Sequence, residues 1–146
     1  MMDNSSFGNN YNKNYDSKPQ SFTAKHFSQM TESERWYLLK KKDRLIGYNT
    51  LFSEHAIERM SERRITERDI VEAVRMGQII EYRKTWKDER ITIRATRLKK
   101  NQFIVYVSFS IRDNVVVTTY YDDARNIHKQ RDFGKYDENL QVQKKF

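Results

Sequence analysis

The sequence has no cysteine, one proline and four glycines in 146 residues. The lack of cysteine excludes disulfides, thiolate zinc sites and a cysteine nucleophile. The glycines form neither a GxGxxG nor a GxxxxGK arrangement, which excludes both common phosphate-binding loops. No stretch approaches the roughly 18 apolar residues of a membrane helix, and the first thirty residues contain no signal-peptide pattern. We therefore expect a cytoplasmic protein with no membrane contact.

Metal ligands are also sparse. The chain has three histidines and no HxH or HExxH motif, and the paired Asp122-Asp123 alone would bind a metal poorly. We therefore expect neither metal nor other cofactor. RNA can still be cut without metal, because its own 2′-hydroxyl can attack the neighbouring phosphate. The protein then supplies a base, an acid and positive charge.

Positive charge is what the sequence has in excess. Lysine and arginine number 28 against 20 aspartates and glutamates, giving a net charge of +8. A basic domain of this kind favours a polyanionic partner, most simply RNA. The alternative is a basic surface that serves only solubility.

The ends of the chain lack a helical or strand period. Residues 1–29 are rich in Asn, Ser, Gly and Lys and predict a disordered N-terminal arm. Residues 30–48 predict a helical extension, because Thr31 and Glu34 form a capping-box pattern and Gly47 ends the run. Residues 132–146 are polar and predict a flexible C-terminal tail.

The central segment, residues 50–131, begins with a pattern typical of a helical hairpin. Ser53 is a helix N-cap before an apolar stripe in residues 54–63. Thr66 and Asp69 then form a second capping box, and Gly77 ends the helix that follows.

From residue 78 onward the apolar period changes to two. Strands are predicted at 79–82, 90–98, 103–111 and 115–121, with a short final helix at 122–131. The fold class is therefore α+β: two to three N-terminal helices packed on one face of a four-stranded antiparallel meander sheet whose other face is polar.

His55 and Arg59 form the first candidate site. They stand four residues apart on a predicted helix and share a face. Histidine can take a proton from a hydroxyl near neutral pH, and arginine can bind phosphate through two hydrogen bonds. The alternative is a helix-start histidine that packs against the sheet edge and bonds to backbone.

A second candidate set lies on the predicted sheet. Arg90, Thr92, Arg94 and Thr96 alternate onto the polar face, with the two arginines about 7 Å apart, near the spacing of phosphates on a single strand. The alternative is a solvent-facing strand of polar residues. Residues 118–121 (TTYY) would add one hydroxyl and one phenol, from whichever member of each pair faces the polar side. His128 is a weaker candidate base, and His26 is expected to be solvated.

The helical hairpin and the last predicted strand resemble a known family. Residues 52–80 read FSEHAIERMSERRITERDIVEAVRMGQII, and 116–121 read VVTTYY. This is similar to the domain of unknown function 4258 family, with its His-Ala-x-x-Arg-Met helix, R-x-I-[ST]-x-x-D-I turn and closing strand. The matching residues are His55, Ala56, Arg59, Met60, Arg63, Ile65, Thr66, Asp69, Ile70 and Gly77. One departure is Arg64, where the family has a small residue.

The family in turn looks like a branch of the RelE-like and colicin-like ribonuclease toxins. The resemblance implies a RelE-like domain at 50–131 and metal-independent RNA cleavage of a phage or mobile-element toxin type, with a cognate inhibitor or host complex as protein partner. It implies catalytic roles for His55, Arg59, Arg94, Thr119 and Tyr121. Arg63, Arg64, Arg90 and the run Lys40, Lys41 and Lys42 are predicted to contact nucleic acid. Two alternatives stay open: a regulatory module that binds nucleic acid or a host complex without cleavage, and a protein-binding module.

Overall fold

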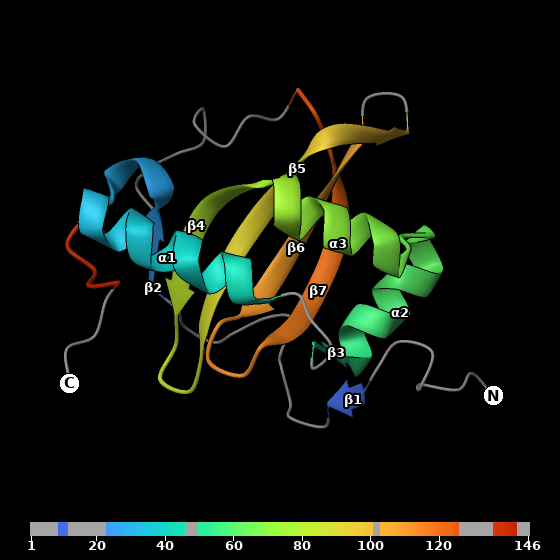
Figure 1. Ribbon diagram of the computed structural model, residues 1–146, viewed down its shortest axis with the longest axis horizontal. Coiled ribbons are helices and arrows are strands. Elements are labelled where there is room, and N and C mark those ends of the chain that lie inside the picture. Colours follow the sequence, from blue (N-terminus) through green and yellow to red (C-terminus); the bar gives the residue numbers. More distant parts are fainter. Residues whose placement is uncertain (1–8, 12–22, 46–49, 101–102, 126–135, 143–146) are drawn as a thin grey trace.

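The structure is a computed structural model that describes residues 9–11, 23–45, 50–100, 103–125 and 136–142 (Figure 1). Within these residues the chain is α+β, with three α-helices and one mixed seven-stranded sheet. The strand order is β1-β3-β7-β6-β5-β4-β2. None of the described helices is both long and apolar enough to cross a bilayer.

The elements have the following bounds in chain order: β1 (Asn9–Tyr11), β2 (Thr23–His26), the 3-10 helix η2 (Phe27–Gln29), α1 (Glu32–Leu45), β3 (Leu51–Ser53), α2 (Glu54–Arg63), α3 (Glu67–Met76), β4 (Gln78–Lys84), β5 (Glu89–Lys100), β6 (Phe103–Ser110) and β7 (Val115–Asp123).

The predicted four-stranded antiparallel meander is wrong. Strands β4 to β7 are consecutive antiparallel neighbours, but β2 adds to β4, and β3 and β1 extend the other edge in parallel. These extra strands have three or four residues each. So short a segment shows no period of two, and its pairing partner lies far along the chain. Two of them fall within residues 1–29, where the sequence indicated no regular structure.

Local capping fixes the helical hairpin. The Ser53 hydroxyl accepts a hydrogen bond from Ala56 N at 3.0 Å, and Thr66 and Asp69 bond reciprocally at 3.1 and 2.8 Å. Gly77 follows α3 because there is no room for a side chain: a Cβ there would come within 2.6 Å of the Arg94 carbonyl oxygen.

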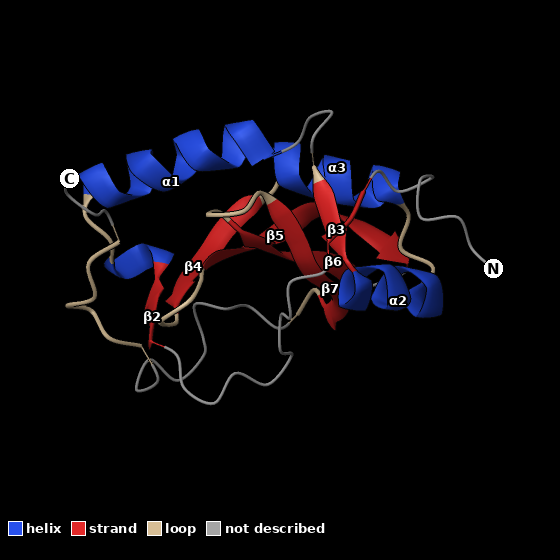
Figure 2. Cartoon of the chain, turned by 90° about the horizontal axis from the view of Figure 1, so that it is seen from below, coloured by secondary structure: helices blue, strands red, loops and turns tan. Residues whose placement is uncertain are grey.

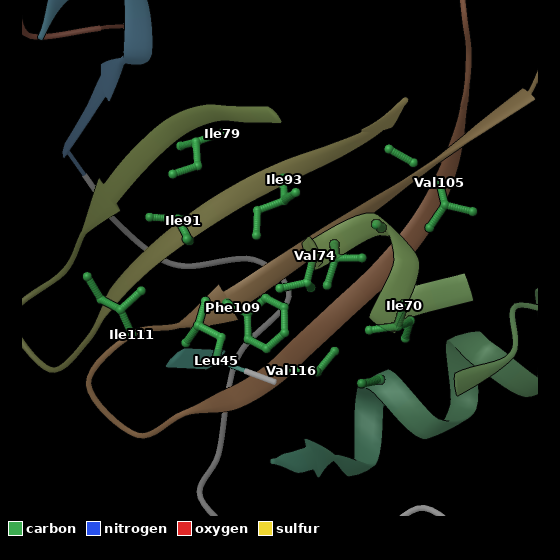
Figure 3. Close-up of a cluster of buried hydrophobic side chains, with 14 of the residues drawn as sticks. Leu45, Ile70, Val74, Ile79, Ile91, Ile93, Val105, Phe109, Ile111 and Val116 are labelled. Atoms are coloured by element: carbon green, nitrogen blue, oxygen red, sulfur yellow. The ribbon is translucent and has the colours of Figure 1, made fainter. Parts of the chain in front are cut away.

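The main core lies between the helices and one face of the sheet (Figure 3). Apolar side chains of the sheet meet buried residues from all three α-helices, each contributing about 1.5–3 kcal/mol when fully buried. Representative members are Leu45, Ala56, Met60, Ile70, Val74, Ile91, Ile93, Val105, Val107, Phe109 and Val116.

The C-terminal segment 136–142 is attached to the sheet. Asp137 N donates to Ala24 O at 2.8 Å, and the Tyr136 hydroxyl donates to Glu81 Oε1 at 2.6 Å. Val142 is fully buried in the main core. The predicted final helix does not begin where expected, because residues 122–123 belong to β7 and residues 124–125 form a turn. Its remaining residues, including His128, lie outside the described part of the chain.

Candidate nucleic-acid site

His55 is the second residue of α2 and is half-buried. Burial lowers its pKa below the usual 6.5, and the positive charge of Arg59 lowers that pKa further. The carboxylates of Glu58 and Glu62 oppose this shift, and the charge of Arg90 on β5 adds to it. At neutral pH the ring is therefore uncharged and can accept a proton.

The hydrogen bonding of the His55 ring bears on whether its role is structural. Among the described residues, no hydrogen bond joins either of its nitrogens to another group. The alternative of a histidine bonded to backbone is therefore not what the structure contains. Arg59 shares the helix face and pairs with Glu62 Oε1, three residues on, with about a third of its side chain exposed.

The polar face of the sheet is not solvent-facing at its centre. Arg90 is buried and its Nε lies 2.7 Å from Asp88 Oδ2. Ser110 Oγ donates to Asp88 Oδ1 at 2.7 Å, so one buried carboxylate joins β5 and β6. Thr92 is buried beside them, whereas Thr96 is exposed. Arg90 therefore contributes a positive electrostatic field and a buried ion pair with Asp88. It does not offer a contact at the surface.

Arg94, two residues along β5, is held by two hydrogen bonds. Its Nε donates to the Tyr106 hydroxyl and its Nη2 to Ala124 O, both at 3.1 Å. The Tyr106 ring stacks on Tyr120 with centroids 5.2 Å apart and planes 9° from parallel. Half-buried Arg94 thus lies beside a tyrosine pair on the face away from the helices.

A β-bulge decides which of the TTYY residues face this site. The register shifts between Ser108 and Phe109, so Thr118 lies opposite Ser108 and Tyr120 opposite Tyr106. Thr119 and Tyr121 consequently point to the helix side, and the Thr119 hydroxyl donates to Tyr106 O at 2.8 Å. The structure therefore does not bring Thr119 and Tyr121 together with Arg94, contrary to what the resemblance implied. An unbroken alternation in the sequence cannot reveal the bulge.

Ser108 is a further residue that sequence analysis missed. It is 3% exposed, and its hydroxyl has no hydrogen-bond partner. Thr92 and Thr118 lie directly opposite it on the neighbouring strands. These three residues form a row across the sheet, in which Thr118 is half-buried and Ser108 and Thr92 are buried.

The other predicted cations do not form one patch with Arg90. Lys40, Arg63 and Arg64 are exposed and Lys41 is half-buried, but Lys42 is buried. Figure 2 shows α1 at the upper left and α2 at the lower right, below α3, so the lysine run of α1 is separated from the arginines at the end of α2. Arg64 adopts a left-handed conformation (φ 55°) as the C-cap of α2.

The described residues contain no cluster of three or more histidine, aspartate or glutamate side chains arranged to hold a metal ion. What they do contain is a histidine on α2 whose pKa is lowered in part by the charge of Arg90. The sheet face away from the helices carries Arg94, a row of hydroxyls and a stacked tyrosine pair.

Fold and site together define an α+β domain with helices on one face of a mixed sheet. The opposite face was expected to be polar, but it carries two small apolar clusters beside its arginines and hydroxyls. Residues 52–121 match the family model described as Domain of unknown function (DUF4258). This segment spans β3 to most of β7 and contains His55, Arg59, Arg94 and the bulged strand. No curated protein and no solved structure matches the chain.

Proposed function

We propose that this protein is a metal-independent endoribonuclease of the RelE-like kind, with His55 as its general base. The observation that carries this proposal is the state of His55: an uncharged imidazole with no hydrogen bond, within the electrostatic reach of Arg90. A structural histidine would be expected to bond to its surroundings, whereas a base needs an open nitrogen.

In the proposed reaction, His55 accepts the proton of a ribose 2′-hydroxyl. The 2′-oxygen then forms a bond to the adjacent phosphorus, the bond to the 5′-oxygen breaks, and a 2′,3′-cyclic phosphate results. The leaving oxygen needs a proton, and the phenol of Tyr120 is our candidate donor. Arg59 and Arg94 would stabilise the charge on the phosphate, and the half-buried Thr118 would hold a polar group of the nucleotide.

The test is incubation of the purified protein with a 5′-labelled RNA oligonucleotide in excess EDTA. We expect products ending in a 2′,3′-cyclic phosphate, formed by the wild type and reduced at least 100-fold in His55→Ala. His26 is not solvated as expected: it is 6% exposed, and its Nδ1 bonds to Ser28. His26→Ala is the histidine control and should cut normally once its folding has been verified. An all-2′-deoxy oligonucleotide should resist cleavage. Equal cleavage by His55→Ala would remove the proposed base.

A second candidate function is RNA binding without cleavage, as expected of a regulatory protein. The observation that favours it is that Arg94 is bound to Tyr106 and Ala124, and that Thr119 and Tyr121 face the helices. In that case RNA would stay intact, and its affinity would fall steeply with salt through displaced counterions. Fluorescence anisotropy from 50 to 300 mM salt measures this directly.

A further inference from the structure

Trp86 stands in the tight turn between β4 and β5, and its side chain is 88% exposed. The turn itself is well ordered by hydrogen bonds. Thr85 N donates to Asp88 O at 2.9 Å, and Lys87 N donates to the Thr85 hydroxyl at 3.3 Å. The indole is therefore held out in water by a fixed backbone and adds almost nothing to the apolar core.

The charge around the indole is positive. The two carboxylates that follow it face inward: Asp88 is 1% exposed and bonded to Arg90, and Glu89 is bonded to Tyr82 and Arg112. Their negative charge is thus neutralised inside the fold. Lys84 and Lys87 are half-buried on either side of the indole, and Lys87 Nζ lies 5.8 Å from the Trp86 ring centroid.

The turn lies at the same end of the sheet as the start of α2. Arg90 pairs with Ser110 near the end of β6, and β3 pairs with the first residues of β7 before α2 begins. Figure 1 shows this end at the bottom of the view, with the β4–β5 turn and β3 both there. From β5 to β3 is three strand spacings, roughly 15 Å. A nucleic-acid strand of a few nucleotides can bridge that distance.

We propose that Trp86 is a stacking platform for an unpaired base of the RNA, on the part of the strand that flanks the site at His55. This rests on the proposed function and narrows its substrate to single-stranded RNA. An indole can stack on any base, because every base has a π-face, and the neighbouring lysines can follow the phosphates. A duplex keeps its bases stacked on one another and offers none to the ring.

A membrane surface would be the other natural partner for a tryptophan beside lysines. Insertion into a bilayer needs more apolar area than one ring, and Trp86 is the one exposed large apolar side chain of this turn. The exposed Leu98 and Phe103 lie at the β5–β6 hairpin, at the other end of β5. Charge and shape therefore favour a single strand of nucleic acid.

The chain contains two tryptophans, which makes the test direct. Trp36→Phe leaves Trp86 as the single reporter, and Trp86→Phe leaves Trp36, which is 61% exposed and also has a lysine, Lys40, over its ring. Each variant is titrated with an unlabelled 10-mer of oligo-dT, which cannot undergo 2′-hydroxyl attack, then with a 10-bp duplex and with vesicles containing anionic lipid.

We expect saturable, salt-sensitive quenching of Trp86 by the single strand, little quenching of Trp36, and a smaller response to duplex. Trp86→Ala should weaken single-strand binding about tenfold, as expected for the loss of one stacked base. Equal quenching of both tryptophans, no quenching of Trp86, or a blue shift of Trp86 with vesicles alone would overturn the platform. His55→Ala should leave the quenching of Trp86 by the single strand unchanged. A failure of the cleavage proposal can therefore be told apart from a failure of the stacking proposal.

Discussion

Lys42 on α1 donates a hydrogen bond from Nζ to Val74 O on α3 at 2.7 Å, and a second to Arg75 O at 3.3 Å. These carbonyls are at the C-terminal end of α3, where the helix leaves acceptors unpaired and the dipole is negative. The lysine that the sequence placed in a nucleic-acid patch therefore joins two helices.

Replacing Lys42 by Met should lower the free energy of unfolding by about 1.5–3 kcal/mol, because a charge-assisted hydrogen bond to buried carbonyls is lost. Lys40→Met, at an exposed neighbour, should change it by less than about 0.5 kcal/mol. Urea unfolding of both variants makes the comparison. Equal free energies of unfolding for the two variants would show that the Lys42 hydrogen bonds make no net contribution to stability.

The buried pair of Arg90 and Asp88 predicts a larger effect. Arg90→Met would leave the Asp88 carboxylate buried without its cation, which costs about 3–5 kcal/mol. Arg63→Met, at an exposed arginine, is the control and should be near neutral. A stable, well-folded Arg90→Met protein in urea titration would show that Asp88 finds other partners.

Two residues that the bulge in β7 turns toward the helices, Tyr121 and Thr119, should respond differently to loss of the hydroxyl. The Tyr121 hydroxyl is buried without a hydrogen-bond partner, so Tyr121→Phe should leave the protein equally stable or up to about 1 kcal/mol more stable. Thr119→Val removes the hydroxyl that donates to Tyr106 O and should cost about 1 kcal/mol.

RNA cleavage should depend instead on the residues of β7 that share the sheet face of Arg94, Thr118 and Tyr120. Thr118→Val and Tyr120→Phe should reduce RNA cleavage while Tyr121→Phe leaves it unchanged, because only the first two face Arg94. Cleavage lost in Tyr121→Phe and kept in Tyr120→Phe would place the site on the helix side of the sheet.

Glu34 makes the attachment of the C-terminal segment depend on pH. Burial alone would raise the pKa of Glu34, but hydrogen bonds from Lys25 and from Thr31 N and Val142 N outweigh it and leave the pKa below 4.5. Since the folded pKa is depressed, the ionised carboxylate stabilises the fold fully above about pH 4.5. That contribution is lost as pH falls through the lower folded value.

Wild type should therefore lose stability relative to Glu34→Gln as the pH drops from 6 to 3, with the difference vanishing in the most acid samples. Hydrogen exchange of the Val142 amide, which bonds to Glu34 Oε2 at 3.1 Å, reports the same event locally. A stability difference that does not change with pH would contradict this role for Glu34.

The sequence predicted those features that depend on neighbouring residues. The caps at Ser53 and Thr66 and the stop at Gly77 are local signals, and the structure has all three. The alternation in β5 likewise predicted that Arg90 and Arg94 share a face. It could not predict that Arg90 is buried, since its partner Asp88 and the hydroxyl of Ser110 come together only in the folded sheet.

The features that were missed depend on contacts between distant segments. β2 and β3 acquire their strand character from β4 and β7, with which they pair, because three or four residues carry no periodic pattern of their own. The bulge in β7 is likewise not visible in the sequence. One extra residue in this strand changes the face of the sheet on which Thr119 and Tyr121 lie, and no residue type signals it.

The central claim is that His55 is the base of a metal-free ribonuclease, and the pH dependence of kcat/KM for RNA cleavage in EDTA tests it most directly. Because the pKa of His55 is lowered, activity should fall only below pH 6.5, with an acid-limb midpoint under that value. In His55→Ala the rate should drop at least 100-fold and this limb should disappear. Intact RNA with folded wild-type protein at every pH, or an unchanged acid limb in His55→Ala, would contradict the account.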